Sequence, residues 1–583
     1  MFQRLTVLAI LAFALAFLAA KIIKQGDLKY VSDISKRIEF KNRTAIGCGT
    51  NWAIVNELIE ETDIPIIPGS GNHTWKISTK NDCAQRYFNQ GINMYYSFHI
   101  IEAMASFKKA IKFDPDCAML YWAQALTYGP NINDLGYIAS PDALKATGMA
   151  VQLSGKASDL EKALINAMAV RYTADSADAT RKKLNEAYTA MMKKAYESFK
   201  SSDDAQALYA DAMMLEHPWD LWNINGTPKP WTPLIEKVLE HLLVKNPAHP
   251  GANHYYIHVM EPSPYAAKAL PSANRLGKLT PALSHTVHMP SHIYLRTGNY
   301  NAGISVNQNA VKSYNKVVGF YGPASGGDFL YVIHNLHMQT NVAMLAGRSA
   351  FSLQSANETK NSIPADYLNS PAPMGSAVQY IYMIPTLVNI RFGNWNELLS
   401  AKEPDQKQIY ATVLFHFGKG MAMAHQANTT AAKSELVLMQ EIMKDSGLFI
   451  PFGTFSPAID GARVAENLLA GSISMTEKDY KKAIEFFNKA ATIEENMVYT
   501  EPRDWLLNPK HYLANAYLQN RNFKEAEAVL KKDLQNNYEN GWALFGVYQS
   551  LLAQQKRSAA AAILFRFKKA FGQADIKLSG PVF

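Results

Sequence analysis

The chain has 583 residues and a formal net charge of +8, and 48% of its residues are apolar against 19% charged. This length exceeds what one hydrophobic core usually holds, so it implies several domains or one long repeat array. The composition excludes broad disorder, and the thinly spread charge, without a block of Lys and Arg, does not predict a nucleic-acid surface.

Residues 1–24 are predicted to be a targeting segment rather than part of the fold. The apolar run from Leu5 to Ala20 follows one basic residue, and it is shorter than the about 20 residues that a membrane-spanning helix needs. This pattern favours an export signal, although Leu18 stands where cleavage after Ala20 would require a small residue. The alternative is an uncleaved anchor over residues 5–23. We therefore expect an exported chain, periplasmic or secreted, or one held at the membrane by its N-terminus.

Residues 25–80 are predicted to form an irregular cap before the first repeat. The stretch "DIPIIPGSGNHTWKIST" is rich in Pro and Gly, which favours a loop or an extended segment over a helix. It contains His73, and the sequence allows two locations for this side chain. A loop histidine usually faces solvent, but this one could fold over the mouth of a cavity.

An internal repeat dominates residues 81–583. If Ala84 is position 1 of a unit, small and aromatic residues and a proline occupy characteristic later positions: Gly91 is 8, Ala103 is 20, Phe107 is 24 and Pro115 is 32. These are signature positions of the tetratricopeptide repeat, a helix–turn–helix unit of about 34 residues. The same frame recurs in residues 478–490 and 513–530. The predicted fold is therefore all-α: a tetratricopeptide-repeat helical solenoid, or superhelix, that follows an irregular N-terminal segment.

Histidines recur at the same positions of two successive units. With units that start at Pro250 and Ser284, both position 5 and position 9 are histidines in each unit. These residues are His254 and His258 in the first unit and His288 and His292 in the second, while Glu261 occupies position 12 and His285 occupies position 2. Steps of three or four residues keep such positions on one face of a helix. We expect these side chains to converge on one cavity from adjacent helices.

A third unit, which starts at Ile333 after an insertion, restores the frame. It has His334 at position 2, His337 at position 5 and Asn341 at position 9. In tetratricopeptide repeat proteins, which this stretch resembles, the first helix of each unit lines the concave groove. The resemblance implies that these three side chains face the groove as well.

Clustered imidazoles suit zinc, copper or iron, and a carboxylate can complete the ligand shell. The sequence therefore predicts a concave site that binds a divalent transition metal and a small ligand. The predicted metal ligands are His254, His258, Glu261, His288 and His292. The residues predicted to support these ligands or to contact the bound molecule are His285, His334, His337, Asn341 and Tyr255. A glutamate beside an open metal position could also act as a general base on a bound water.

Three other interpretations remain open. A metal-free groove could bind an extended peptide or a glycan, or the histidines could form a purely structural cluster. The third is a metal-dependent enzyme of unknown reaction, although the sequence has no H-E-x-x-H motif, no G-x-S-x-G elbow and no phosphate-binding loop. Pro290 weakens the metal interpretation, because a proline between His288 and His292 is expected to distort their spacing. We expect neither a nucleic acid nor, apart from an N-terminal anchor, a membrane as a partner.

Several longer stretches point to a more specific family. They are "GSGNHTWKIST", "FDPDCAMLYWAQALTYGPNIN", "NHYYIHVMEPSP", "HMPSHIYLRTGNY" and "DLQNNYENGWALFG". Together they resemble a family of long bacterial tetratricopeptide repeat proteins, over nearly the whole chain after the leader. The resemblance implies a repeat fold and an export signal. Members are usually described only by their repeats, so it carries over no catalytic residue.

Overall fold

The computed structural model describes residues 52–60, 64–134, 137–175, 177–318, 328–453, 455–503 and 505–583. Within these ranges the chain is helical, and it forms no β-strand beyond one isolated bridge. None of the helices in them has the length and apolar character that crossing a bilayer requires. The predicted targeting segment, residues 1–24, lies outside these ranges. Residues 25–51 of the predicted irregular segment, residues 25–80, lie outside them as well. That segment contains helix α2 (Trp52–Glu60), which was not predicted, whereas residues 64–81 form neither helix nor strand.

The first part of the array consists of α3 (Asp82–Tyr96), α4 (Ile100–Phe113), α5 (Ala118–Thr127), α6 (Pro141–Leu153), α7 (Asp159–Ala169), α8 (Arg181–Ser198), α9 (Asp203–Glu216), α10 (Thr232–Lys245), α11 (Pro250–Met260) and α12 (Leu270–Leu279). The middle part consists of α13 (Ser284–His288), α14 (Pro290–Arg296), α15 (Tyr300–Val318), α16 (Asp328–Leu345), α17 (Ser349–Asn361), α18 (Ala365–Leu368), α19 (Met374–Tyr382), α20 (Ile384–Phe392) and α21 (Trp395–Ser400). The last part consists of α22 (Ile409–His425), α23 (Thr429–Ile442), α24 (Ala458–Thr476), α25 (Tyr480–Asn496), α26 (Pro509–Gln519), α27 (Phe523–Asn536), α28 (Gly541–Ala553) and α29 (Arg557–Ala570). Short 3-10 turns are η1 (Ser154–Lys156), η2 (Ala266–Ala269) and η4 (Ser446–Phe449).

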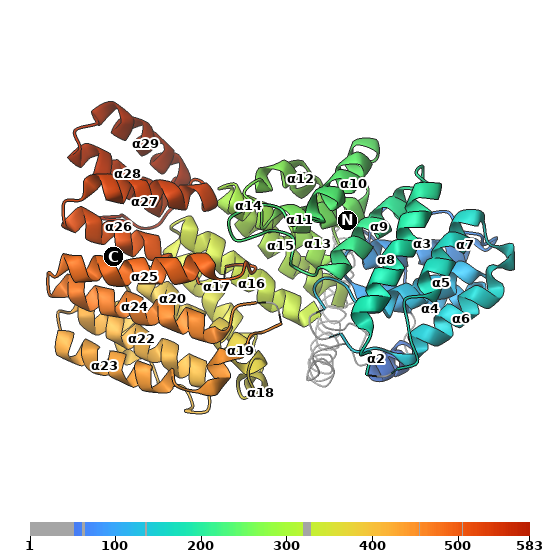
Figure 1. Cartoon of the computed structure of the whole chain (residues 1–583), viewed down its shortest axis with the longest axis horizontal. Helices are drawn as coiled ribbons and strands as arrows, with labels where there is room; N and C mark the ends of the chain where they lie inside the picture. Colours follow the sequence, from blue (N-terminus) through green and yellow to red (C-terminus); the bar gives the residue numbers. More distant parts are fainter. Residues whose placement is uncertain are drawn as a thin grey trace, which may run out of the picture.

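Successive helices pack as hairpins, and the hairpins stack side by side from α3 to α29 (Figure 1). Tight turns connect the two helices of a hairpin. Gly298 between α14 and α15 and Gly347 between α16 and α17 adopt left-handed angles, with φ of +75° and +72°, which glycine tolerates best. The predicted all-α tetratricopeptide superhelix is confirmed.

The predicted repeat frame matches the helix starts where the histidines lie. Helix α11 begins at Pro250 and helix α13 begins at Ser284, the predicted first residues of two units. Helix α16 begins at Asp328, before the predicted unit start at Ile333. The turn glycines Gly298 and Gly347 both occupy position 15 of their units, so the third unit keeps the frame of the second although its first helix begins one turn earlier.

The end of the array folds back against its middle. The guanidinium of Arg296, at the end of α14, donates to the carbonyl oxygen of Asn536 at 3.3 Å. The hydroxyl of Tyr300, at the start of α15, donates to the carbonyl oxygen of Tyr538 at 2.8 Å. These contacts join α14 and α15 to the α27–α28 connection, which Figure 1 shows next to them. The superhelix is closed at this point, so loops of the last repeats reach the histidine-bearing helices.

Two large hydrophobic clusters form the core. One extends through residues 52–317 and the other through residues 344–582. The histidine-bearing helices α11, α13, α14 and α16 lie where the first cluster gives way to the second. The candidate site therefore sits at the junction of the two halves, away from the outer surface.

Candidate metal centre

Helix α11 carries the first pair of histidines. Pro250 occupies its first turn, and the Nδ1 atom of His249 caps the helix by accepting the backbone N–H of Ala252 at 3.1 Å. His254 and His258 are four residues apart, so their rings lie one above the other on the same helical face. Both side chains are buried.

A glycine allows α11 to approach α3 closely. A Cβ atom added at Gly251 would lie 2.5 Å from the ring of Tyr96, a distance that side chains do not tolerate. The close approach brings the Nδ1 atom of His254 within 2.7 Å of the Tyr96 carbonyl oxygen. The position of His254 thus depends on a small residue one turn before it.

The second pair, His288 and His292, spans the boundary between α13 and α14. Pro290 has no N–H to donate, which interrupts the helical hydrogen bonding there. Met289 nevertheless keeps helical angles, with φ −48° and ψ −35°, so the chain continues in the same direction. The Nε2 atoms of His288 and His292 are 2.7 Å apart. The distortion predicted from Pro290 does not separate the pair.

Three imidazoles converge in what we call the first set, which consists of His254, His258 and His285. The Nε2 atom of His254 lies 3.0 Å from the Nε2 atom of His258 and 3.0 Å from that of His285. The ring centroid of His254 is 4.8 Å from each of the other two centroids. The three rings therefore radiate from a common point, and at most 1% of each residue is exposed.

Hydrogen bonds on the far side of these rings fix where the protons lie. The Nδ1 atom of His254 faces a backbone carbonyl oxygen at 2.7 Å, and that of His258 faces the Oε1 atom of Glu261 at 2.9 Å. Both oxygens only accept, so each Nδ1 atom carries a proton. In the neutral rings the two Nε2 lone pairs would then face each other across 3.0 Å. A cation or an extra proton between them is needed to make this contact favourable.

The second set consists of His288, His292 and His334, and it has a similar arrangement. The side-chain oxygen of Asn307 accepts from the Nδ1 atom of His288 at 2.6 Å. The amide nitrogen of Asn307 donates to the Gly303 carbonyl oxygen at 2.8 Å, which fixes the orientation of the amide. His288 therefore also presents an unprotonated Nε2 atom, here toward His292. The ring of His334 lies 4.6 Å from that of His288.

The spacing of the ring nitrogens is close to that of metal ligands. In each set, one nitrogen of every histidine lies within 4.8 Å of the others. A tetrahedral ion holds imidazole nitrogens about 2.0–2.1 Å from itself, and hence ~3.3 Å from one another. The shortest nitrogen pairs, at 3.0 Å and 2.7 Å, would need to separate by only ~0.3–0.6 Å to reach that value.

Glu261 links the two sets. Its Oε1 atom lies 2.9 Å from the Nδ1 atom of His258, and its Oε2 atom lies 2.8 Å from the Nδ1 atom of His292. The second contact is strongly bent for a hydrogen bond, but it remains a close ion pair. The hydroxyl of Tyr499 donates to the Oε2 atom at 3.0 Å. Glu261, predicted as a metal ligand, thus contacts the ring nitrogens that point away from the convergence points.

A second carboxylate enters from a distant loop. The Oε2 atom of Glu501 lies 3.7 Å from the Nε2 atoms of both His292 and His334, and its Oε1 atom lies 3.7 Å from the Nδ1 atom of His258. The sequence analysis missed this residue. The one available signal was the long connection between α25 and α26, residues 497–508, in an array whose other connections are mostly short.

The electrostatic environment divides the histidines into two groups. Burial, together with neighbouring histidines, lowers the pKa well below its usual value in His254, His285, His288 and His334. Burial acts in the same direction on His258, but hydrogen bonds with Glu261 and Glu501 outweigh it and raise its pKa to about 9. The same carboxylates raise the pKa of His292 against the effect of burial. The cationic form is therefore favoured at one histidine of each set.

The two carboxylates also differ from each other. Burial opposes ionisation of Glu261, but the charge of His292 and the hydrogen bond from His258 hold its pKa well below the usual range. Burial and the adjacent charge of Glu261 raise the pKa of Glu501 to about 7. Glu261 is thus a permanent anion between the sets, whereas Glu501 can exchange a proton near neutral pH.

Two aromatic residues in left-handed backbone conformations cover the first set. Phe98 (φ +55°), which follows α3, stacks on the rings of His258 and His285 with centroids 5.9 Å and 5.5 Å away. Trp219 (φ +61°), which follows α9, meets His258 edge-on at 5.4 Å. Phe98 occupies position 15 of its unit, where Gly298 and Gly347 adopt the same conformation in later units, so its positive φ belongs to the hairpin turn. Neither residue was identified from the sequence.

The remaining predicted residues lie outside both sets. The ring of Tyr255 packs among the rings of Tyr96 and Phe98. His337 and Asn341 are buried on α16, but neither contributes an atom to the two sets. His285 and His334, predicted to play supporting roles, instead stand in the same positions as the predicted ligands. Both sets are built in the same way, from positions 5 and 9 of one unit and position 2 of the next unit.

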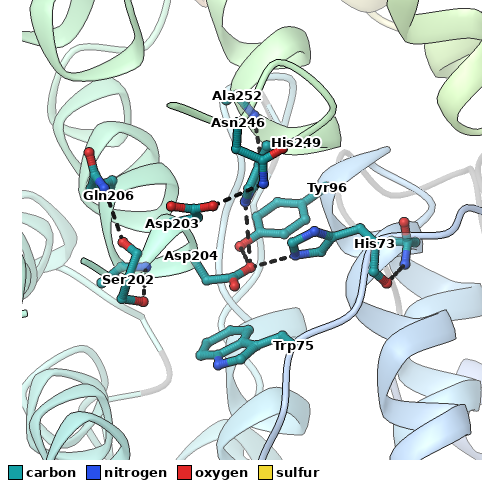
Figure 2. A network of polar contacts seen from close by, with 12 residues as sticks. His73, Trp75, Tyr96, Ser202, Asp203, Asp204, Gln206, Asn246, His249 and Ala252 are labelled. Carbon is teal, nitrogen blue, oxygen red and sulfur yellow. Dashed lines mark hydrogen bonds and ion pairs between the residues drawn. The ribbon is translucent and has the colours of Figure 1, made fainter. Parts of the chain in front are cut away.

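A third cluster with comparable spacing lies apart from the two sets. Figure 2 shows His73, Tyr96 and His249 converging on Asp204. The Oδ1 atom of Asp204 lies 2.8 Å from the Nε2 atom of His73, 2.8 Å from the Tyr96 hydroxyl and 3.5 Å from the Nε2 atom of His249. The sequence leaves two positions open for His73, in solvent or folded over a cavity. Its ring does not face solvent but packs with its centroid 4.6 Å from that of His249. We call these four residues the Asp204 cluster.

Comparison with known proteins identifies the repeat. The tetratricopeptide repeat family matches residues 467–497, which lie in α24 and α25. No curated protein sequence matches the chain.

Three solved structures are among those to which the chain is similar. The human IFIT1 dimer with m7Gppp-AAAA shares 11% identity, over 84% of this chain and 91% of that chain, with a TM-score of 0.29. Yeast Tom70 shares 10% identity over 84% and 92%, with a TM-score of 0.28. The APC/C hetero-tetramer Cut9–Hcn1 shares 11% identity over 84% and 74%, with a TM-score of 0.28. At such low scores, function has to be inferred from the site itself.

Proposed function

We propose that this tetratricopeptide repeat protein binds two transition-metal ions, one at each histidine set, and a small ligand beside them. Zinc, copper and iron are the candidates, because imidazole nitrogens suit all three. The observation that carries the proposal is the pairing of Nε2 atoms at 3.0 Å and 2.7 Å. Acceptors on the opposite side of these rings hold the protons on Nδ1, which leaves the facing nitrogens available as ligands.

The Nδ1 partners match the usual surroundings of metal-bound histidines. Such rings donate their other N–H to a carboxylate, a backbone carbonyl or water. Here the partners are Glu261, the Tyr96 carbonyl oxygen and the Asn307 side chain. We therefore assign to Glu261 the role of orienting ligands in both sets, in place of the predicted role as a ligand.

The two metal-free interpretations account less well for the same geometry. A purely structural cluster would need an extra proton between the facing Nε2 atoms of each pair, and hence a buried imidazolium in each set, whereas a bound metal ion uses both lone pairs directly. An extended peptide would need contact with the histidines, yet at most 1% of any first-set histidine is exposed. A small ion can occupy such a buried position, whereas a peptide cannot.

A carboxylate lies beside the second set. A bound transition metal would supply Lewis acidity to a ligand held beside it. Glu501 lies 3.7 Å from the Nε2 atoms of His292 and His334, and its pKa is raised to about 7. Because a bound cation favours the ionised form of a neighbouring carboxylate, Glu501 would be an anion beside the metal and would orient a ligand that donates hydrogen bonds. Because no nucleophile or substrate is identified, the proposal extends to ligand binding but specifies no reaction.

Elemental analysis tests the proposal directly. The full chain is loaded with Zn²⁺, freed of excess metal and analysed beside the double variant His254→Ala, His292→Ala, which removes one nitrogen from each set. We expect about two zinc ions per wild-type chain and loss of both in the variant. The matched control is His241→Ala with His425→Ala, which removes two exposed histidines and should leave the zinc content unchanged. Absence of zinc from the wild type, or equal zinc in both double variants, would refute the proposal.

Export is a separate part of the proposal. It rests on the apolar run in residues 1–24, which lie outside the described ranges. Expression of the full chain in a bacterial host, followed by fractionation and N-terminal sequencing, tests it. A mature N-terminus near Ala20 in the periplasm would support an export signal, an intact N-terminus in the membrane fraction would support the anchor, and cytoplasmic protein would refute both.

A further inference from the structure

A pocket adjoins the second histidine set. Its volume is about 430 Å³, and it lies among α16, α19, α24 and the loops around residues 450–457 and 497–502. Its wall includes His334 and Glu501, so a molecule in it would lie next to the second set. The volume is within the about 300–1,000 Å³ of small-molecule sites. We call it the apolar pocket.

The walls of the apolar pocket are aromatic and aliphatic. Tyr380 and Tyr410 stack with centroids 6.0 Å apart, and Trp219 and Phe455 pack at 6.4 Å. Among the described residues that line it, none is a lysine or an arginine, and the one carboxylate is Glu501. In metal-free protein, an anionic ligand would therefore lose its hydration without a compensating charge from these walls. The lining favours an uncharged ligand with a flat apolar body.

One polar atom in this wall needs a partner. His337 lines the pocket and is 6% exposed, and among the described residues no group forms a hydrogen bond with its Nε2 atom. A buried polar atom without a partner is costly, and native structures rarely retain one. Burial also lowers the pKa of His337 to about 3, so the ring is neutral at pH 7. A ligand hydroxyl, which both donates and accepts, could pair with either tautomer.

We propose that the apolar pocket binds a small uncharged aromatic compound that carries a hydroxyl group. Its ring packs against Tyr380 and Phe455, and its hydroxyl pairs with the Nε2 atom of His337. This binding requires only the residues that line the pocket and no metal ion. The further statement that this compound is the ligand of the metal centre rests on the proposed function.

Fluorescence titration of the full chain with 2-naphthol tests the pocket. In zinc-free protein we expect saturable binding, and at least tenfold weaker binding of naphthalene-2-sulfonate, which has the same rings with an anionic group. Ala377→Trp on α19 and Ala458→Trp on α24 each place a large side chain in the pocket, so each should abolish binding. The control Ala559→Trp, at an exposed position of α29, should bind as the wild type does. His337→Leu should weaken binding about tenfold.

The zinc content of the same samples separates the two proposals. Zinc retained without saturable 2-naphthol binding would overturn the pocket proposal and leave the metal proposal standing. Binding that both pocket-filling variants abolish, in protein that holds no zinc, would support the pocket and refute the metal function. Circular dichroism shows which of the two pocket-filling variants folds. If a folded variant binds 2-naphthol as tightly as the wild type does, the pocket proposal is overturned.

Discussion

The two histidine sets and the Asp204 cluster look alike by distance alone. In each, three ligand-type atoms lie within 4.8 Å of one another. They differ in the position of the protons. In the first set, His254 donates from Nδ1 to a carbonyl oxygen, so its Nε2 atom is free to act as a ligand. In the Asp204 cluster, His249 accepts the Ala252 N–H at Nδ1, so its proton lies on Nε2 and points toward Asp204.

The difference shows that the hydrogen bond at Nδ1 of a histidine decides whether its Nε2 atom carries a proton or can bind a metal ion. Asp204 accepts hydrogen bonds from His73 and Tyr96, and the Nε2 atom of His249 lies 3.5 Å away without forming a hydrogen bond. Burial opposes its ionisation, but His249 and His73 hold its pKa well below the usual range. An anion surrounded by donors does not need a metal. We therefore interpret the Asp204 cluster as a structural contact between residues 64–81 and helices α3, α9 and α11.

Removal of the central carboxylate is the strongest way to separate the two regions. Asp204→Ala would leave the buried hydroxyl of Tyr96 and the Nε2 donor of His73 without an acceptor, and it would remove the anion 3.5 Å from His249. We expect a loss of about 3 kcal/mol or more in the free energy of unfolding, because breaking a buried, hydrogen-bonded charge typically costs this much. Zinc content should not change. Urea unfolding and elemental analysis of the same preparation measure both quantities.

Asp203→Ala is the matched control for that experiment. Asp203 is the preceding residue on α9, and it forms a partly exposed pair with Lys245. Such pairs contribute about 0–1 kcal/mol, so the control should unfold near the wild-type urea concentration. If Asp204→Ala lost zinc while keeping wild-type stability, the assignments of the two regions would have to be exchanged.

Glu261→Gln tests the role of the carboxylate that joins the sets. The amide keeps the shape but replaces the anion that faces Nδ1 of His258 and of His292. We expect zinc affinity to fall about 10- to 100-fold, as is typical when a partner of a ligating histidine is changed. Competition with a chelator of known affinity measures the change. Glu240→Gln, at a carboxylate that accepts from Tyr256 far from the sets, should behave as the wild type, and equal affinity in both variants would contradict the assignment.

The repeat frame explains why much of the site could be predicted from the sequence. Helical hairpins follow from small and aromatic residues at fixed intervals, which is a local property of the chain. The same interval places His254 and His288 in equivalent positions of adjacent helices, and their rings do lie in neighbouring sets. Local spacing was therefore sufficient to identify the histidine-bearing face.

Residues from other parts of the chain could not be predicted in this way. Glu501 reaches the second set only because the superhelix closes between α14 and the α27–α28 connection. Phe98 depends on the approach of α3 to α11, which Gly251 permits. Each of these features depends on packing between distant segments, which periodicity does not encode.

The smallest expected effect is confined to the second set. Asn307→Leu keeps the volume of the side chain and removes the oxygen that accepts from Nδ1 of His288 at 2.6 Å. The hydroxyl of Ser291, 3.3 Å from the same nitrogen, could partly replace it, so we expect only about a tenfold loss of affinity. The first set should be unaffected, so a zinc titration should show one unchanged and one weakened step. Equal weakening of both steps would mean that the sets bind metal as one unit, and unchanged affinity would mean that Asn307 does not position His288.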